Sequence, residues 1–434
     1  MINSRRKFIR STSIVAAGVG LSSIIPSSLY SCSASNRIRI GAIGINSMGW
    51  SDLNAILKNP ETECVALSDV DENVLNKRIA ELAKVGIKVK GYTDYRKLLE
   101  DKSIDAVVIG TPDHWHCLIM VEACQAGKDV YIEKPIGNSI VECRSMVAAQ
   151  QRYNRVVQVG QWQRSQQHFK NAIDFVHSGK LGKIQLVKAW AYFSWVTPIP
   201  KLPDGNPPAG VDYAMWLGPA PKRPFNPNRF HFNFRWFWDY AGGLMTDWGV
   251  HLLDYALLGM GQDTPKSIMA SGGKFASPLS AAETPDTLTT VYEFDGFNIQ
   301  WEHAQGIDDG PYNRQHGIAF LGNNGTLVLD RDGWEVIPEG KKMEVVPRQE
   351  SVDKGLDLHA KNFIEVIKSR KIEKLHAPIQ VGSNIATFCQ MGNIAFRTGD
   401  KIHWDDKKGM FNEAEANKFL SKDYQNGYAI PSVK

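Results

Sequence analysis

The sequence is poor in cysteine, and its cysteines form no pattern that builds a metal site or a disulfide framework. None of the six stands in a C-x-x-C pair, and no histidines are clustered at zinc-ligand spacing. Apart from Cys32, each lies in an apolar helix or strand pattern, where cysteine acts as a small hydrophobic residue. We therefore expect no metal centre and no disulfide framework.

An excess of charge of one sign is also lacking once the first residues are set aside. The chain has 50 Lys+Arg and 46 Asp+Glu, a formal net charge of +4. Residues 1–31 hold four basic residues and no acidic one, so the remainder carries 46 of each sign. A neutral chain has no electrostatic attraction for nucleic acid or for an acidic membrane surface. The charge balance therefore predicts no nucleic-acid partner.

No hydrophobic run near the N-terminus is long enough for a membrane span. The apolar run Ile14–Leu21 has eight residues, whereas a bilayer requires about 20. It follows Ser4–Arg10, which resembles the S-R-R-x-F-L-K pattern of twin-arginine export signals. We interpret residues 1–31 as a cleaved twin-arginine signal peptide, so the protein is expected outside the cytoplasm, in the periplasm.

The end of this leader offers two processing routes. Leu29–Cys32 loosely resembles a lipobox, in which case Cys32 would carry a lipid anchor and the protein would be a membrane-anchored lipoprotein. The alternative is an ordinary signal-peptidase cut near Ser33-Ala34.

The rest of the chain divides into two regions, as expected for about 400 residues. In residues 36–160 short apolar strands alternate with helices, which predicts an α/β fold with a doubly wound parallel sheet of the Rossmann type. Residues 161–434 are predicted to form a C-terminal α/β domain with a large, mostly antiparallel sheet, for substrate binding and oligomerisation. Residues 197–242, rich in proline and aromatics, are predicted to be an irregular loop, and two helices are predicted at 359–369 and 379–397.

A dinucleotide fingerprint fills the turn between the first strand and the first helix. Residues 44–49 read G-I-N-S-M-G, so asparagine replaces the middle glycine of G-x-G-x-x-G. Twenty residues after Gly49, Asp69 ends the second strand, where an acid accepts the ribose 2′-hydroxyl. The neighbouring acids would repel a 2′-phosphate, which favours NAD over NADP. The predicted cofactor-binding residues here are Gly44, Asn46, Ser47, Met48, Gly49 and Asp69.

Two further segments follow buried strands and so reach the ligand-binding edge of the sheet. They supply the other predicted cofactor-binding residues: Thr111, Pro112, Asp113, His116, Glu133 and Lys134. Lys134 there would meet the nicotinamide ribose and a substrate hydroxyl. Taken singly, it is also consistent with a surface ion pair.

These motifs together resemble the Gfo/Idh/MocA superfamily, named for glucose–fructose oxidoreductase and inositol dehydrogenase. The resemblance rests on T-P-x-x-x-H at residues 111–116, E-K-P at 133–135 and D-x-x-x-H at 247–251. It implies that Lys134, Asp247 and His251 form the catalytic group. It also implies that Asp113, His116 and residues 161–164, with Trp162 and Arg164, lie near the cofactor or sugar.

The chemistry of the three residues agrees with alcohol oxidation. A histidine titrates near neutral pH, so His251 can take the hydroxyl proton and return it. Asp247, one helical turn earlier, would orient the imidazole or hold a neighbouring hydroxyl. Lys134 would polarise the oxygen. The alternative for His251 is a core histidine on an apolar helix.

Half of the twelve tryptophans fall within residues 190–248, interleaved with polar residues in the stretch 229–239. Flat apolar faces beside hydrogen-bond donors are typical of sugar sites, although packing explains some of these rings. Trp162, Arg164, Arg235 and Trp248 are the predicted substrate-binding residues.

The leading hypothesis is an exported, NAD-dependent oxidoreductase that acts on a sugar, polyol or glycoside and keeps its cofactor, as a dimer or tetramer. The alternatives are a redox-neutral glycosidase that retains NAD, a glycoside 3-dehydrogenase feeding a separate lyase, and a non-catalytic sugar-binding protein.

Overall fold

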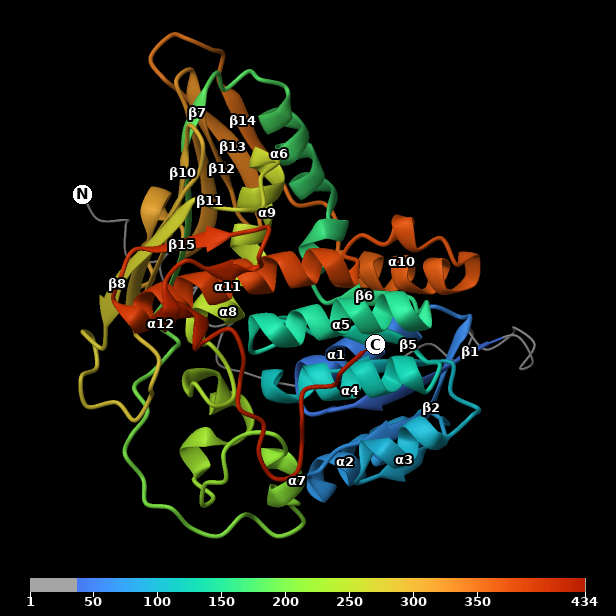
Figure 1. Cartoon of the computed structure of the whole chain (residues 1–434). Helices are drawn as coiled ribbons and strands as arrows, with labels where there is room; N and C mark the ends of the chain where they lie inside the picture. Colours follow the sequence, from blue (N-terminus) through green and yellow to red (C-terminus); the bar gives the residue numbers. More distant parts are fainter. Residues whose placement is uncertain (1–36, 434) are drawn as a thin grey trace, which may run out of the picture.

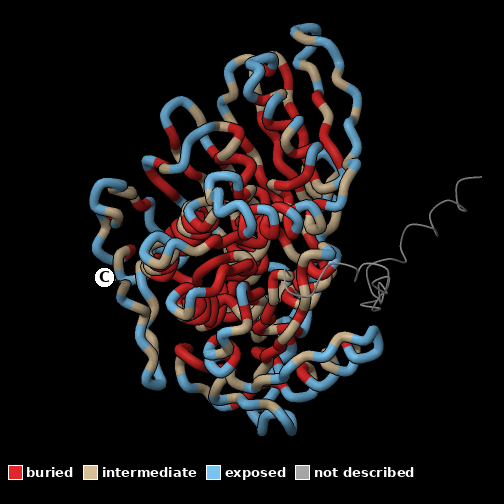
Figure 2. Tube along the Cα trace, turned by 90° about the vertical axis from the view of Figure 1, so that its right-hand side faces the viewer, coloured by how far each residue is buried: buried red, intermediate tan, exposed pale blue. Residues whose placement is uncertain are grey.

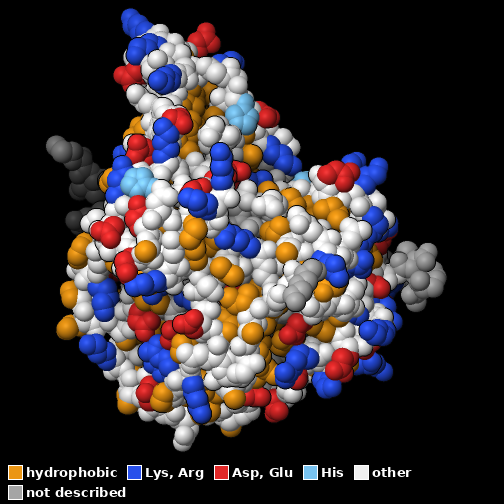
Figure 3. Space-filling model, viewed as in Figure 1, with side chains coloured by type: hydrophobic (Ala, Val, Ile, Leu, Met, Phe, Trp, Pro, Cys, Tyr) orange, Lys and Arg blue, Asp and Glu red, His pale blue; other side chains and the backbone are white. Residues whose placement is uncertain are grey.

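The structure, a computed structural model, describes residues 37–433, which form two β-sheets with helices around and between them (Figure 1). The predicted signal peptide and Cys32 lie outside the described residues. On the face seen in Figure 3, acidic and basic side chains are interspersed, without a large area of one sign.

The first sheet has six parallel strands in the order β3-β2-β1-β4-β5-β6, which confirms the doubly wound prediction. All four residues of β4 are buried, as expected for a strand covered on both faces. The strands are β1 (Ile38–Ile43), β2 (Thr62–Ser68), β3 (Lys90–Tyr92), β4 (Ala106–Ile109), β5 (Asp129–Ile132) and β6 (Val157–Val159).

Polar side chains mark where several helices of this region begin. The carboxylates of Asp71 and Asp94 and the hydroxyl of Ser139 accept hydrogen bonds from backbone N–H groups of the first turn. The helices are α1 (Met48–Leu57), α2 (Glu72–Lys84), α3 (Tyr95–Glu100), α4 (Asp113–Gln125) and α5 (Ile140–Tyr153). The sequence analysis did not predict β3 and α3, because both are too short for a clear periodic pattern.

The second sheet has ten strands in the order β14-β13-β12-β11-β7-β10-β9-β8-β15-β16. It is mixed, because β10 runs parallel to β7 while the other pairs are antiparallel. Tight hairpins through Asp295-Gly296 and Asn323-Asn324 join β9 to β10 and β11 to β12. The strands are β7 (Ile184–Phe193), β8 (Ser267–Gly273), β9 (Thr287–Glu293), β10 (Asn298–Gln305), β11 (His316–Gly322), β12 (Gly325–Leu329), β13 (Gly333–Pro338), β14 (Val346–Glu350), β15 (Ile402–Asp405) and β16 (Met410–Phe411).

Helices α6, α9 and α11 pack against this second sheet. The helices of the region are α6 (Gln167–His177), α7 (Tyr213–Leu217), α8 (Gly243–Asp247), α9 (Gly249–Met260), α10 (Gly355–Ser369), α11 (Ile379–Thr398) and α12 (Ala414–Asn417). Residues 197–242 hold only α7 and two short 3-10 helices, which confirms the prediction of an irregular segment.

Two late helices cross back to the first sheet and join the two regions. Phe363 of α10 is fully buried in one core with residues of β1 and β5. In α11, Ala386 packs into the core beside α5, whereas Phe388 packs into the core of the second sheet. The two helices therefore contribute to the cores of both regions, and Figure 2 shows buried segments gathered in the middle of the molecule.

Within residues 37–433, no helix combines the length and the apolar character needed to cross a membrane. The cysteines in this part of the chain are all buried free thiols: Cys64, Cys117, Cys124, Cys143 and Cys389.

We predict that the first sheet depends on α10 for its stability. Phe363→Ala removes a fully buried ring that lies edge-on to Tyr131, and such a cavity costs about 3–5 kcal/mol of unfolding free energy. Urea unfolding of the full chain measures this loss. The matched control is Phe275→Ala, because Phe275 is 68% exposed and should change stability by only about 0.5 kcal/mol. Equal stability of the two variants would contradict the prediction.

Candidate active site

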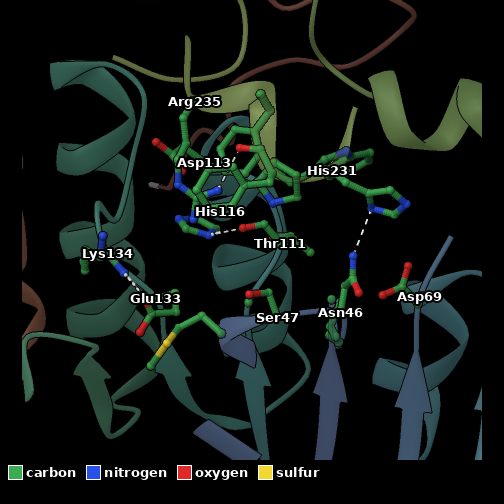
Figure 4. A pocket seen from close by; sticks show the side chains of 18 of the residues that line it. Asn46, Ser47, Asp69, Thr111, Asp113, His116, Glu133, Lys134, His231 and Arg235 are labelled. Atoms are coloured by element: carbon green, nitrogen blue, oxygen red, sulfur yellow. Dashed lines mark hydrogen bonds between the residues drawn. The ribbon is translucent and has the colours of Figure 1, made fainter. Parts of the chain in front are cut away.

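A cavity of about 610 Å³ lies between the carboxyl ends of the first sheet and residues that belong to the second region. Strands β1, β2, β4 and β5 all end at its floor, as Figure 4 shows for Asn46, Asp69, Thr111 and Glu133. Its roof comes from the segment 230–251 and from Arg331. Ligands of doubly wound sheets bind at this edge.

The turn between β1 and α1 is shaped so that the backbone is open to a ligand. Gly44 has φ +76°, and a Cβ placed there would lie 2.7 Å from the backbone nitrogen of Thr111. A Cβ on Gly49 would lie 2.1 Å from the carbonyl oxygen of Gly44. Only glycine satisfies both positions, and the N-terminus of α1 that follows is suited to a pyrophosphate.

Asp69 lies at the end of β2, where the predicted ribose contact requires it. Its carboxylate accepts hydrogen bonds from the backbone N–H groups of Ile45, at 3.0 Å, and Asp71, at 3.1 Å. Burial raises its pKa, and these two N–H groups oppose that shift. The carboxylate is thus fixed beside the turn, in a position to accept hydrogen bonds from the hydroxyl groups of a ribose.

A segment from the second region crosses this nucleotide end of the cavity. We call residues 209–231 the strap. Its backbone pairs with the β2–α2 turn through Glu72 N–H to the Gly210 carbonyl, at 2.8 Å, and Asp212 N–H to the Val70 carbonyl, at 2.9 Å. His231, the last residue of the strap, lies between the β1–α1 turn and the β2–α2 turn.

The His231 imidazole spans the two sides of the nucleotide end. Nδ1 lies 3.1 Å from the Asn46 amide nitrogen (Figure 4). Nε2 lies 3.1 Å from a carboxylate oxygen of Asp71. The residue has φ +50°, a left-handed conformation that costs a non-glycine residue about 1–2 kcal/mol. The two side-chain contacts offset this strain.

The middle of the cavity is built by the loops after β4 and β5. The His116 ring lies between the carbonyl oxygens of Pro135, at 2.7 Å, and Thr111, at 2.8 Å, and so connects the two loops. Burial raises the pKa of Asp113 to about 8 and that of Glu133 to about 7. Both carboxyls therefore hold a proton more readily than an exposed acid does.

An ion pair stands at the other end of the cavity. Lys134 Nζ donates hydrogen bonds to Asp247 Oδ1 and to the Asp247 carbonyl, both at 2.8 Å. Arg235 Nε lies 3.4 Å from the same carboxylate oxygen. Burial alone would raise the pKa of Asp247, but the two cations outweigh it and lower the pKa to about 2. Asp247 is therefore ionised at neutral pH.

His251 lies on the cavity wall in the first turn of α9. Burial, followed by the nearby cations Lys134 and Arg331, holds its pKa well below the usual 6.5. Its Nδ1 is sealed from solvent without a hydrogen bond, so Nε2 is the nitrogen that faces the cavity. Asp247 does not hydrogen-bond this ring; its carboxylate contacts Lys134 and Arg235 instead.

Arg331 is a cavity residue that the sequence analysis missed. It comes from the turn between β12 and β13, where a single arginine looks like a surface charge. Its guanidinium carbon lies 4.3 Å from the Trp248 ring centre and 4.8 Å from that of Trp162. These two tryptophans were predicted at the substrate, and both line the cavity.

The structure brings most of the predicted residues together. The following all line the cavity: Gly44, Asn46, Ser47, Met48, Asp69, Thr111, Pro112, Asp113, His116, Glu133, Lys134, Trp162, Arg235, Asp247, Trp248 and His251. Two predicted residues do not: Gly49 packs within the turn, and Arg164 forms a two-bond ion pair with Asp254 of α9, at 2.7 and 2.6 Å. Arg164 thus stabilises the position of α9, which forms part of the cavity wall, and does not itself reach the cavity.

Other residues of the aromatic segment have structural positions. Trp190 and Trp236 are buried in the core, and Arg229 pairs with Asp204. Within residues 37–433, no group of three or more His, Cys, Asp or Glu side chains is arranged to hold a metal ion.

Comparison with known proteins places both regions in one family. The family model GFO_IDH_MocA, described as "Oxidoreductase family, NAD-binding Rossmann fold", matches residues 38–161. Its partner GFO_IDH_MocA_C2, described as "Oxidoreductase family, C-terminal alpha/beta domain", matches residues 170–430. The residues at the nucleotide end agree with this description, so the cofactor is NAD.

Among individual proteins, inositol 2-dehydrogenase of Salmonella typhimurium is 29% identical over 168 residues, which is 38% of this chain and about half (49%) of that protein. The structure of aldose-aldose oxidoreductase from Caulobacter crescentus complexed with glycerol has a TM-score of 0.65 and 18% identity, over 85% of this chain and 100% of that one. The structure of levoglucosan dehydrogenase, complexed with NADH and levoglucosan, has a TM-score of 0.64 and 16% identity, over 85% of this chain and 99% of that one. At these identities the structures show a shared fold.

We predict that Asp69 sets the preference for NAD over NADP. Asp69→Asn removes the charge that would repel a 2′-phosphate and weakens the ribose contact. The ratio of the two dissociation constants should shift toward NADP by on the order of 10- to 100-fold, the range for one hydrogen bond to a charged group. Fluorescence titration of nucleotide-free protein measures both constants.

The control for this prediction is Asp295→Asn, because the Asp295 side chain is 86% exposed in a surface hairpin. A ratio that is the same in both variants would show that Asp69 does not select the cofactor.

Proposed function

Because this chain belongs to the Gfo/Idh/MocA family of oxidoreductases, we propose that it is an exported enzyme that acts on a sugar, polyol or glycoside and holds its NAD tightly. The hydride passes between a secondary hydroxyl carbon of the substrate and the cofactor. One observation carries the proposal: the Lys134–Asp247 ion pair and the open Nε2 of His251 lie in one cavity with the nucleotide turn.

Each residue has a separate part in the reaction. The neutral His251 accepts the hydroxyl proton at Nε2, since burial keeps its pKa low. The Lys134 ammonium, oriented by Asp247, stabilises the negative charge that develops on the substrate oxygen. NAD, which would be held by the Gly44–Gly49 turn and by Asp69, would supply the hydride acceptor for the same carbon. The substrate would become a carbonyl compound, and His251 would keep the hydroxyl proton. In the reverse direction His251 returns the proton.

Retention of NAD is supported by the strap. Its two backbone hydrogen bonds to the β2–α2 turn and the contacts of His231 with Asn46 and Asp71 close over the nucleotide end. A ligand beneath such a segment leaves only when these contacts open. A second sugar that returns the hydride would then restore the cofactor, as would a redox-neutral cycle.

Export is supported by the twin-arginine pattern of residues 4–10, with lipidation at Cys32 as part of the proposal. This route carries folded proteins, so NAD is bound before export. The buried cysteines Cys64, Cys117, Cys124, Cys143 and Cys389 are free thiols, as expected of a protein that folds in a reducing compartment. We further propose a homodimer or tetramer that uses the outer face of the ten-stranded sheet.

The NAD-retaining glycosidase remains the second candidate, because the strap suits a cofactor that is reduced and reoxidised in one cycle. A glycoside 3-dehydrogenase that feeds a separate lyase would use the same site. The experiment is to purify the full protein, identify co-purified NAD by mass spectrometry, and supply aryl glycosides. Nicotinamide absorbance and aglycone release are then followed together.

Reduction without release supports the dehydrogenase, and release without net reduction supports the glycosidase. Absence of both, with sugar binding intact, would contradict an enzymatic function for this site.

We predict that His251→Ala lowers kcat by about 100-fold or more, the usual contribution of a general base, while NAD remains bound. The pH dependence follows from its lowered pKa: the base is unprotonated above that pKa, so kcat/KM for oxidation is kept as the pH falls to about 6.5 and is lost only below. His177→Ala is the control, because His177 is an exposed residue of α6 that does not line the cavity. Unchanged turnover in the His251 variant would contradict the mechanism.

We also predict that His231→Ala loosens the strap. The purified variant should contain less NAD per protein after gel filtration, because it lacks the contacts with Asn46 and Asp71. The NAD dissociation rate, measured by stopped-flow exchange, should rise by about tenfold, as for the loss of one charge-assisted hydrogen bond. The rate in His177→Ala should match that of the unaltered protein. An unchanged rate in His231→Ala would refute a retaining role for this contact.

A further inference from the structure

Arg331 is a charged group of the cavity that forms no ion pair with a carboxylate of residues 37–433. Its hairpin contains two acids, and neither forms an ion pair with it. Asp332 acts on the guanidinium only through its charge, and Asp330 ion-pairs with Arg314 and accepts hydrogen bonds from the N–H groups of Asp332 and Gly333. No carboxylate among the described residues lies within 4.0 Å of the Arg331 guanidinium. Its Nε is sealed from solvent and makes no hydrogen bond.

The other cations of the cavity differ from it in this respect. Lys134 and Arg235 both contact the Asp247 carboxylate. An unpaired cation away from water is costly, so proteins normally supply a carboxylate beside it. Burial lowers the pKa of Arg331 only to about 10, so it is charged at neutral pH. Asp247 and Asp332 stabilise this charge from a distance, but neither carboxylate pairs with the guanidinium directly.

The surroundings of Arg331 determine how a ligand can approach it. Trp248 and Trp162 cover the guanidinium, at 4.3 and 4.8 Å from its carbon. A guanidinium stacked on rings makes hydrogen bonds through its edge, in its own plane. The planar edge matches the two oxygens of a carboxylate, or two oxygens of a sulfate or phosphate.

The charge balance at this end of the cavity also favours an anion. Lys134, Arg235 and Arg331 face a single carboxylate that is firmly ionised, Asp247. The nearby histidines add no charge to this balance. Burial holds the pKa of His251 well below its usual value and lowers that of His316, which packs against Trp248, to about 4, so both rings are neutral.

We propose that Arg331, between Trp162 and Trp248, binds an oxyanionic group of the substrate, so that the enzyme acts on acidic sugars. This inference rests on the proposed function and names its substrate class. The anionic group, a carboxylate, sulfate or phosphate, lies at the guanidinium edge. The sugar ring then extends toward Lys134 and His251, where the hydroxyl is oxidised.

The test compares matched acidic and neutral sugars on the NAD-loaded full protein. D-glucuronate and D-galacturonate are paired with D-glucose and D-galactose, and glucose 6-sulfate and glucose 6-phosphate distinguish the kind of anion. Binding is measured by calorimetry and by the fluorescence of the flanking tryptophans. Turnover is measured separately as kcat/KM.

The informative variant is Arg331→Gln, with Arg331→Lys as the conservative change. We expect Arg331→Gln to weaken binding of the preferred acidic sugar by on the order of 10- to 100-fold, the range for a hydrogen bond between charged groups. Binding of the neutral partner should change little, and Arg331→Lys should recover part of the loss. The control is Arg348→Gln, which removes an arginine of β14 that does not line the cavity.

The outcomes separate this proposal from the proposed function. If no acidic sugar binds more tightly than its neutral partner, or if Arg331→Gln weakens both equally, the oxyanion site is overturned even though turnover persists. If an acidic sugar binds through Arg331 but no sugar is oxidised, the binding site stands and the proposed function fails.

Discussion

The Lys134–Asp247 ion pair is the interaction on which the geometry of the site depends. It joins residues 113 positions apart in the chain, one after β5 of the first sheet and the other at the end of α8. Both side chains are mostly buried, so removing one partner would leave the other charge unpaired at high cost. The pair therefore fixes the position of the cavity roof relative to the cavity floor. His251, which follows Asp247 in the chain, is held in the same cavity as the nucleotide turn. Arg235 reinforces it from the roof side.

Much of the floor of the site was predictable because strand ends and turn chemistry are local properties. Gly44 and Asp69 could be placed from the first strand, the turn and the second strand alone. The same holds for Lys134, since the carboxyl ends of parallel strands share one edge. The roof was less predictable, because it depends on contacts between distant segments. His231 was grouped with substrate residues by sequence, yet the strap brings it to the nucleotide end.

Arg164 and Arg331 also show that long-range contacts limit the prediction of site residues from sequence. Arg164 was predicted in the site and lies outside it, whereas Arg331 was not predicted and lies in it. Arg164 belongs to a segment that the family resemblance placed near the ligand, but Asp254 on α9 takes its guanidinium into the wall. Arg331 lies in a polar hairpin, and no periodicity marks it as a cavity residue. The parallel pairing of β10 with β7 was not predicted either, because alternation identifies a strand but not its partner. In each case a long-range contact decided the outcome.

In the proposed retention of NAD, the strap would add a second control on the lifetime of the bound nucleotide. In an open cleft, a dinucleotide dissociates at a rate set by its own contacts. Beneath the strap, its departure would also require the segment 209–231 to separate from the β2–α2 turn, which is a local opening of the protein itself. Such openings have their own free energies, set by hydrogen bonds and packing rather than by the ligand. The residence time of NAD is then partly a measure of how stable one surface segment is, and substitutions far from the nucleotide can tune it.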